Sequence, residues 1–219
     1  MTTDDQPTPT RNAKIQLAAL TAALTWIGLA LELYGFIHRA LMQQLGVLHG
    51  IATFLNFFTN LSNLLAAITL TLWVKHTRSK EGGFPNYLDI TSMVVYVWLA
   101  GLVYNLMLRG LFHANWPATI ILHDIVPVLF LIFWWTCIPR LRFTVKQVLS
   151  WLLFPIVYFI YTLIRGALGD RYPYPFLDVS KFGYGMIMEN ALGIMFALLA
   201  LSMVLVVLNN LKPNNLKPK

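Results

Sequence analysis

The chain has 219 residues, of which 58% are hydrophobic and only 11% are charged, with a formal net charge of +7. Soluble domains carry about 25% charged residues, so this composition excludes an ordinary soluble enzyme. The positive charges are scattered over short polar segments, which is typical of a membrane topology signal and does not indicate a nucleic-acid-binding surface.

Apolar segments of about 20 residues recur along the chain, and each is long enough to cross the roughly 30 Å hydrocarbon core of a bilayer. Glycine, proline and asparagine residues mark the breaks between them. The predicted spans are Ile15–Ile37, Ala52–Val74, Leu88–Arg109, Ala118–Thr136, Gln147–Leu168 and Gly185–Leu208. We therefore predict an all-α membrane protein, a six-transmembrane-helix bundle. It forms a single domain over residues 15–208, with tails at residues 1–14 and 209–219.

Lysine and arginine residues are distributed unequally between the two sides of these spans. Eleven of the 16 lie on the side of the two termini and five on the other side. The five are Arg39, Arg109, Arg165, Arg171 and Lys181. Because cytoplasmic loops carry the excess of positive charge, we expect both termini in the cytoplasm and the chain in the plasma (inner) membrane.

A polar stripe lies in the outer half of the second predicted span. Asn56, Thr59, Asn60 and Asn63 recur at helical spacing and would project from one side of a continuous helix. Polar side chains are costly in hydrocarbon and usually mark a site or a path. Asn, Ser and Thr also join neighbouring helices by hydrogen bonds, so a purely structural role stays open for this stripe.

The other spans carry polar residues at the same predicted depth, which favours one pocket open toward the outer side. These residues are Glu32, Asn105, Arg109, His123, Asp124, Arg165, Glu189 and Asn190. Arginines near span ends can instead extend to lipid head groups, and a Glu189–Arg165 pair can be purely structural. A histidine inside a span is a functional candidate, which makes His123 the strongest single residue.

The residue types in this layer limit the chemistry. A zinc site needs three or four His, Cys or carboxylate ligands, and His123 is the one histidine inside a predicted span. The GxSxG motif of serine hydrolases does not occur. A Thr59 hydroxyl activated by His123 remains, because a nearby imidazole can take its proton. Asn60 or Asn63 would then donate to an oxyanion and Arg165 would bind a carboxylate. Buried threonines also often bond their own helix backbone, which is the competing interpretation.

Four sequence stretches carry a family resemblance: FFTN at residues 57–60, LHDIVP at 122–127, YTLIRGA at 161–167 and YPYPFLD at 172–178. Together they resemble bacterial members of the androgen-induced membrane protein family, from the second span to the sixth. The animal members are six-span, Thr/His-dependent hydrolases of fatty acid esters of hydroxy fatty acids. The resemblance implies Thr59 as nucleophile and His123 as its histidine.

Two features depart from that family. The interval from His123 to Pro127 is one residue shorter than in the animal proteins, and the asparagine-rich face after Thr59 is unlike theirs. The fold and the Thr/His pair therefore transfer better than the substrate does.

We therefore expect an integral-membrane hydrolase of lipid-like esters that needs no cofactor or metal. Its partners would be a lipid or fatty-acyl substrate and the bilayer, with no nucleic acid; protein partners stay open. The candidates for binding the substrate or an oxyanion are Asn56, Asn60, Asn63, Asp124, Arg165, Glu189 and Asn190.

Two other classes of function compete with this expectation. One is a small transporter with a proton or ion relay through Glu32, His123, Asp124 and Glu189; the other is a non-catalytic lipid-binding or scaffold protein. The group that orients His123 is open between Asp124, Glu189 and a backbone carbonyl, although adjacent residues of a helix point about 100° apart.

Overall fold

The computed structural model describes residues 9–79, 87–111, 116–169 and 171–212, and no strand occurs within these ranges. The elements in chain order are α1 (Pro9–Met42), α2 (Val47–Phe54), α3 (Phe58–Ser79), α4 (Tyr87–Val103), η1 (Tyr104–Leu108), α5 (Pro117–Ile120), η2 (Ile121–Ile125), α6 (Val126–Cys137), α7 (Val145–Ser150), α8 (Leu153–Ala167), η3 (Pro175–Leu177) and α9 (Val179–Leu211).

Within the described ranges, five helical segments are long and apolar enough to cross a membrane, and there are six if the sharply bent pair α2–α3 counts as one span. The five are Arg11–Met42, Asp89–Leu108, Pro117–Cys137, Val145–Ala167 and Val179–Leu211. The architecture is that of a multi-pass, all-helical membrane protein. The first and last helices run beyond the predicted spans and into the segments predicted as tails, because α1 starts at Pro9 and α9 ends at Leu211.

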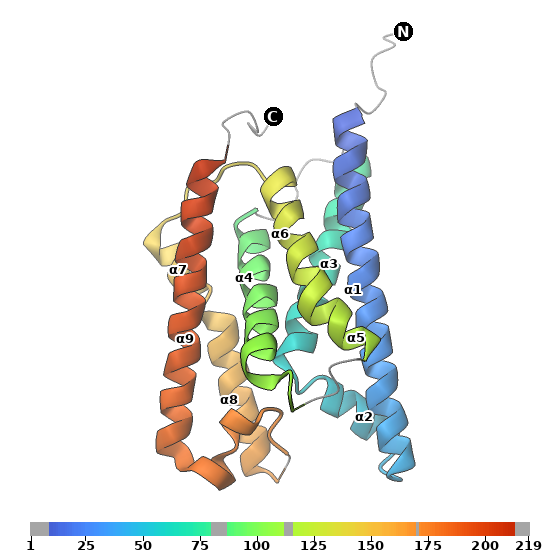
Figure 1. Cartoon of the computed structure of the whole chain (residues 1–219), viewed down its shortest axis with the longest axis vertical. Helices are drawn as coiled ribbons and strands as arrows, with labels where there is room; N and C mark the ends of the chain where they lie inside the picture. Colours follow the sequence, from blue (N-terminus) through green and yellow to red (C-terminus); the bar gives the residue numbers. More distant parts are fainter. Residues whose placement is uncertain (1–8, 80–86, 112–115, 170, 213–219) are drawn as a thin grey trace.

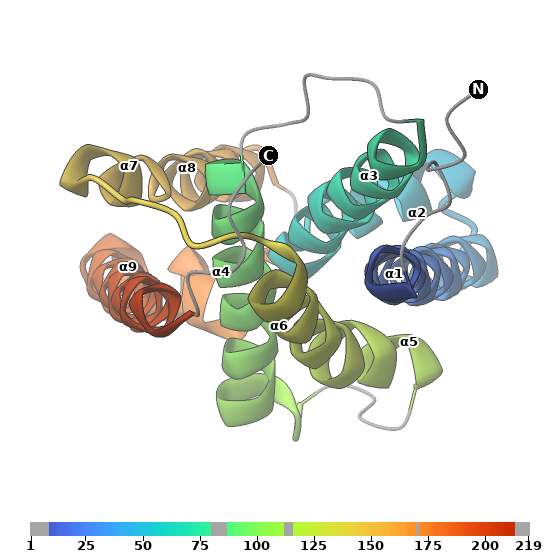
Figure 2. The ribbon, with the colours of Figure 1, turned by 90° about the horizontal axis from the view of Figure 1, so that it is seen from above.

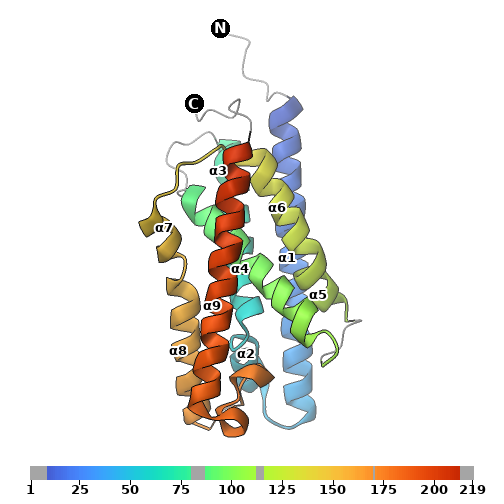
Figure 3. The ribbon, with the colours of Figure 1, turned by 60° about the vertical axis from the view of Figure 1, so that its left-hand side comes forward.

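The helices form two groups with α4 between them. α1 begins and α9 ends at the same end of the bundle, while α2 and η3 lie at the opposite end (Figure 1). Seen from above, α4 separates α1, α3 and α6 from α7, α8 and α9 (Figure 2), and it packs against α3, α6 and α9. A rotated view shows α4 inclined to α9 (Figure 3).

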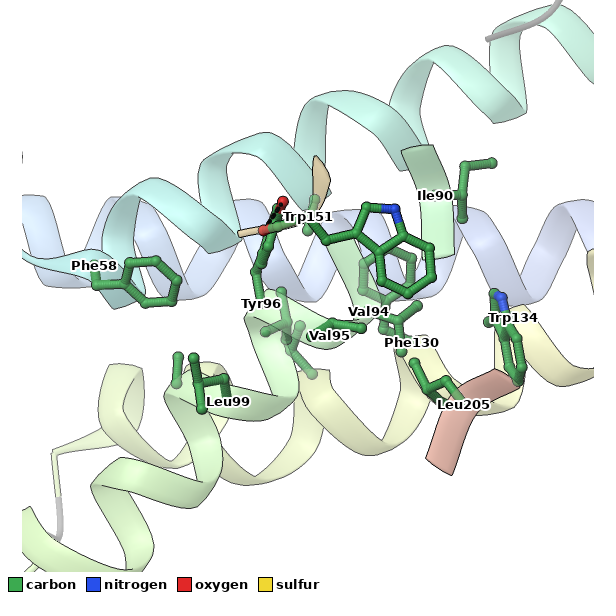
Figure 4. Close-up of a cluster of buried hydrophobic side chains, with 14 of the residues drawn as sticks. Phe58, Ile90, Val94, Val95, Tyr96, Leu99, Phe130, Trp134, Trp151 and Leu205 are labelled. Carbon is green, nitrogen blue, oxygen red and sulfur yellow. Dashed lines mark hydrogen bonds between the residues drawn. The ribbon is translucent and has the colours of Figure 1, made fainter. Parts of the chain in front are cut away.

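The central position of α4 follows from its sequence, which is apolar on every face from residue 93 to residue 103. Val94 and Val95 have no exposed surface, and they belong to one buried cluster with Phe130 and Trp134 of α6 (Figure 4). A helix that is apolar all round is stable only inside a protein or a membrane. The α4 helix therefore forms the axis on which both groups are assembled.

The α8 helix is joined to α3 and α4 mainly through aromatic side chains. Phe154 lies 5.3 Å from Phe58 and 5.0 Å from Tyr96, and Tyr158 lies 5.2 Å from Phe58, measured between ring centroids. The Tyr96 hydroxyl also donates to the carbonyl of Trp151 at 2.8 Å (Figure 4). These rings fill the space between α8 and the rest of the bundle.

The prediction of one continuous second helix is wrong. α2 ends at Phe54, α3 begins at Phe58, and the two helices are bent by 81°. Side chains satisfy the carbonyls that the break frees: the Asn60 amide donates to Phe54 at 2.9 Å, and the Tyr158 hydroxyl donates to Asn56 at 2.9 Å. Asn56 therefore lies in the break and does not share a helical face with Thr59, which occupies the first turn of α3.

Candidate active site

The Thr59 hydroxyl differs from the other threonine hydroxyls in how it is bonded. Each of five others donates to the carbonyl four residues earlier, namely those of Thr21, Thr25, Thr53, Thr71 and Thr136. Because Thr59 is in the first turn of α3, the residue four positions earlier, Leu55, lies in the break. The Thr59 Oγ1 instead lies 3.3 Å from Nε2 of His123. The predicted competing interpretation, a bond to its own helix, does not describe this threonine.

The imidazole of His123 is held in a definite tautomer. Its Nδ1 lies 3.0 Å from the carbonyl oxygen of Thr119, and a carbonyl can only accept. The proton is therefore on Nδ1, and Nε2 presents its lone pair to Thr59. The Tyr104 ring packs against the imidazole with centroids 4.0 Å apart. A backbone carbonyl, one of the three alternatives, orients this ring.

Two π-helical turns form the surroundings of His123: η2 contains it, and η1 packs against it through Tyr104. In η1 the N–H of Arg109 donates to the carbonyl of Tyr104 at 2.8 Å, and in η2 that of Val126 donates to Ile121. Such turns are rare and occur often at functional sites. Pro127 has no N–H, so it cannot bond the carbonyl of His123 four residues earlier. The Asn105 amide approaches that carbonyl at 3.4 Å.

A polar cluster of Asn105, Arg109 and Asp124 joins η1 to η2 beside the histidine. Arg109 forms an ion pair with the Asp124 carboxylate and donates to the Asn105 side chain at 2.7 Å. The Asn105 amide donates to Asp124 at 3.0 Å. Asp124 thus bonds to η1 and to Arg109 directly after it, and does not hold Nδ1 of His123. Contact with lipid head groups was the alternative for Arg109, but its guanidinium pairs with Asp124 within the protein.

A cavity of about 560 Å³ opens beside Thr59 and His123. Helix α1 forms one wall, with Glu32, Tyr34, Phe36, His38 and Arg39. The other lining side chains come from α3, η1, α5, η2 and the segments next to them: Phe57, Thr59, Asn60, Tyr104, Leu108, Trp116, Thr119, His123 and Tyr174. Acidic, basic and aromatic groups therefore surround the Thr59–His123 pair.

A second, narrower cavity of about 60 Å³ lies on the other side of Thr59, among α4, α8 and α9. We call it the apolar slot, because its walls are almost entirely hydrocarbon, including Leu99, Pro155 and Ala191. Thr59, Leu108 and Tyr174 line both spaces. The Tyr174 hydroxyl also accepts the N–H of Thr59 at 3.5 Å.

Among the seven residues predicted to bind substrate or an oxyanion, Asn60 lines the larger cavity and the other six line neither space. Several of these six instead bond the backbone. Arg165 donates to the carbonyl of Ala52 at 3.0 Å, and Asn63 donates to that of Thr59 at 2.9 Å. Asn190 donates to Phe176 at 2.8 Å, and Asn56 donates to Arg171 at 3.2 Å. Glu189 is exposed on α9.

Sequence reasoning missed several cavity residues, above all Arg39, Trp116 and Tyr174. Arg39 was treated as a charge outside the span, but α1 continues to Met42 and carries it along the cavity wall. One signal was present in the sequence: Glu32, Phe36 and Arg39 follow the i, i+4, i+7 spacing of a single helical face. No comparable local pattern marks Tyr174, which reaches Thr59 from the segment before α9.

No protein-family model matches the chain, and no curated protein or solved structure matches it either. Among the described residues, no three His, Cys, Asp or Glu side chains gather in a way that could hold a metal ion.

Proposed function

We propose that this protein is a membrane-embedded hydrolase of lipid-like esters, with Thr59 as nucleophile and His123 as general base. The observation that carries the proposal is the chain of contacts from the Thr59 hydroxyl to Nε2 of His123 and from Nδ1 to the Thr119 carbonyl. Nucleophile, base and orienting group are the three parts that activated hydroxyl catalysis requires. The resemblance to the androgen-induced family points to the same two residues.

The proposed reaction is acyl transfer in two steps. Thr59 Oγ1 attacks the ester carbonyl while its proton moves to Nε2 of His123, and the leaving alcohol takes that proton as the ester C–O bond breaks. Water then attacks the acyl-threonine, gives a proton to Nε2, and releases the acid as Thr59 regains its proton. The Thr119 carbonyl stabilises the imidazolium that forms in both steps.

Tyr174 is the strongest candidate to stabilise the negative oxygen in these steps. Its hydroxyl lies next to Thr59, and an O–H donor aimed at a developing oxyanion lowers the barrier substantially. Asn60 also lines the cavity, although one of its amide hydrogens is used by Phe54. Asn63 is committed to the Thr59 carbonyl.

The test is turnover of a fatty acid ester of a hydroxy fatty acid and of a simple aryl ester by the purified protein in detergent. Thr59→Val and His123→Gln should each lose at least about a hundredfold in kcat, since both act in the same step. Thr25→Val is the matched control, because Thr25 is buried in α1 and bonds only its own helix. It should keep full activity.

Turnover that survives both site variants would reject the Thr/His mechanism. A wild-type protein that hydrolyses neither ester would instead favour the transporter or lipid-binding alternatives.

A further inference from the structure

Thr59 separates two spaces of opposite character, and His123 lines only one of them. The larger cavity contains the imidazole together with Glu32 and Arg39, whereas the apolar slot contains neither the imidazole nor a charged group. Within an ester hydrolase this asymmetry determines which half of the substrate lies on which side, and the inference below rests on the function proposed above.

The leaving alcohol must lie on the side of His123. The same Nε2 protonates the alcohol oxygen and later activates the water that replaces it, so both must approach from the larger cavity. The acyl chain stays attached to Thr59 between these two events. It therefore needs a separate space that does not block the water, and the apolar slot on the other side of Thr59, at about 60 Å³, takes its first few carbons.

The larger cavity contains a cationic side chain, Arg39, in its α1 wall. The Arg39 guanidinium lies 4.6 Å from the centroid of the Phe36 ring, and its Nη1 lies 3.6 Å from where a Cβ on Gly35 would be. The side chain thus folds back along α1, over the cavity wall. In the part of the chain that the structure describes, no hydrogen bond or ion pair joins this guanidinium to another residue.

His38 also lines this end of the cavity, so its imidazole lies on the same wall as Arg39. Trp116, another lining residue, lies beside Gly35. Glu32 is two turns away on the same face, and its carboxylate is near enough to the Arg39 guanidinium for the two charges to attract each other. An arginine fork recognises carboxylate or phosphate by paired hydrogen bonds.

We infer that the site holds its ester lengthwise, with the acyl chain in the apolar slot and an anionic group on the alcohol half bound by Arg39. The anionic group is a carboxylate or a phosphate. Arg39 is then the residue that selects charged over neutral esters. The sequence suggested Arg165 as the residue that binds a carboxylate of the substrate, and we assign this role to Arg39 instead.

The role of Arg39 is tested with three esters that share one acyl chain. The alcohol half carries a carboxylate in the first ester, the methyl ester of that carboxylate in the second, and a phosphate in the third. Arg39→Gln should raise KM about tenfold for the anionic esters and leave the methyl ester unchanged. The anionic ester whose KM rises more identifies the anion that Arg39 binds. Arg171→Gln removes an exposed arginine that lines neither cavity, and it should change none of the three.

The orientation is tested by filling the slot. Ala191→Leu should lower kcat/KM about tenfold for long acyl chains and little for acetyl esters, and it should not alter the dependence on alcohol length. Leu192→Phe is the matched control, because Leu192 is 55% exposed on the outer face of α9 whereas Ala191 is 7% exposed.

If kcat/KM of Ala191→Leu falls with the length of the alcohol half and not with the length of the acyl chain, the substrate lies in the opposite orientation. This result would overturn the inference. Equal losses on the charged and methyl esters in Arg39→Gln would also overturn it. A separate readout is independent of turnover: the free hydroxy fatty acid should raise the Tm of wild type and of Thr59→Val, but not that of Arg39→Gln. If wild type binds this acid through Arg39 but hydrolyses no ester, the proposed function fails while the anion site stands.

Discussion

Gly101 of α4 lies directly against the carbonyl oxygen of His123: a Cβ at this position would come within 2.8 Å of that oxygen and 3.2 Å of the Pro127 ring. The close crossing of α4 over η2 and α6 therefore requires glycine here. The same crossing presses Tyr104 against the imidazole, so a displacement at Gly101 moves the proposed base.

We expect Gly101→Ala to cost about 1–3 kcal/mol in the free energy of unfolding, because backbone atoms of η2 must shift. It should also lower ester turnover more than tenfold, since small displacements of a general base are costly. Gly193→Ala is the control: Gly193 is inside α9, and no heavy atom lies within 4 Å of its built Cβ. Thermal unfolding and kcat of the two variants measure the difference, and equal activity would show that the crossing does not position His123.

Tyr174→Phe tests the proposed oxyanion donor. The ring should stay in place, because it stacks on Phe176 with centroids 5.2 Å apart and meets Phe57 edge-on at 5.6 Å. Loss of the hydroxyl leaves the Thr59 N–H without its acceptor and should cost about 1 kcal/mol in stability. We expect kcat to fall at least about tenfold with little change in KM. Tyr184→Phe, at an exposed tyrosine, should behave as wild type; unchanged kcat in Tyr174→Phe would remove Tyr174 from the mechanism.

Asp124→Asn should have a small effect, although Asp124 is next to His123 in sequence. The Asp124 carboxylate is bonded to Arg109 and Asn105, and neither bond reaches the imidazole. Because the Thr119 carbonyl orients the imidazole, kcat should change less than about threefold. A hundredfold loss would show that the carboxylate takes part in the chemistry.

The bent pair α2–α3 can be tested as a single span by site-directed labelling. In a Cys137→Ser background, Leu45→Cys and Ser79→Cys place thiols at exposed positions at opposite ends of that pair. An impermeant maleimide added to intact cells should label Leu45→Cys and not Ser79→Cys, if the termini are cytoplasmic as predicted. Labelling of both positions would mean that α3 does not cross the membrane.

The positions of the helices were readable from the sequence because hydrocarbon thickness sets both their length and their composition. The break before Thr59 was not readable, since neither proline nor glycine marks it. It is stabilised from a distance, by the Tyr158 hydroxyl on the carbonyl of Asn56, 102 residues earlier. The Asn60 side chain, which bonds Phe54, acts locally.

Within the candidate site, depth in the predicted spans was enough to place Thr59 and His123 near each other, and their roles stay a prediction. Depth alone was not enough to distinguish side chains that line a cavity from side chains that donate hydrogen bonds to backbone carbonyls. Asn63 and Arg165 have the same predicted depth as Thr59, yet both donate to carbonyls. The direction of a side chain at a given depth depends on how its helix is rotated about its own axis. Packing between helices determines this rotation.

The aromatic attachment of α8 has a consequence for how a substrate arrives. Contacts between rings can be remade when helices shift, whereas a tight crossing such as that at Gly101 cannot open without moving both helices. The rings lie between α8 and the helices α3 and α4, and the apolar slot lies beside them, with Phe58 and Tyr158 in its lining. If the protein hydrolyses lipid esters as proposed, the acyl chain would reach Thr59 along this aromatic boundary from the surrounding bilayer, without entering water.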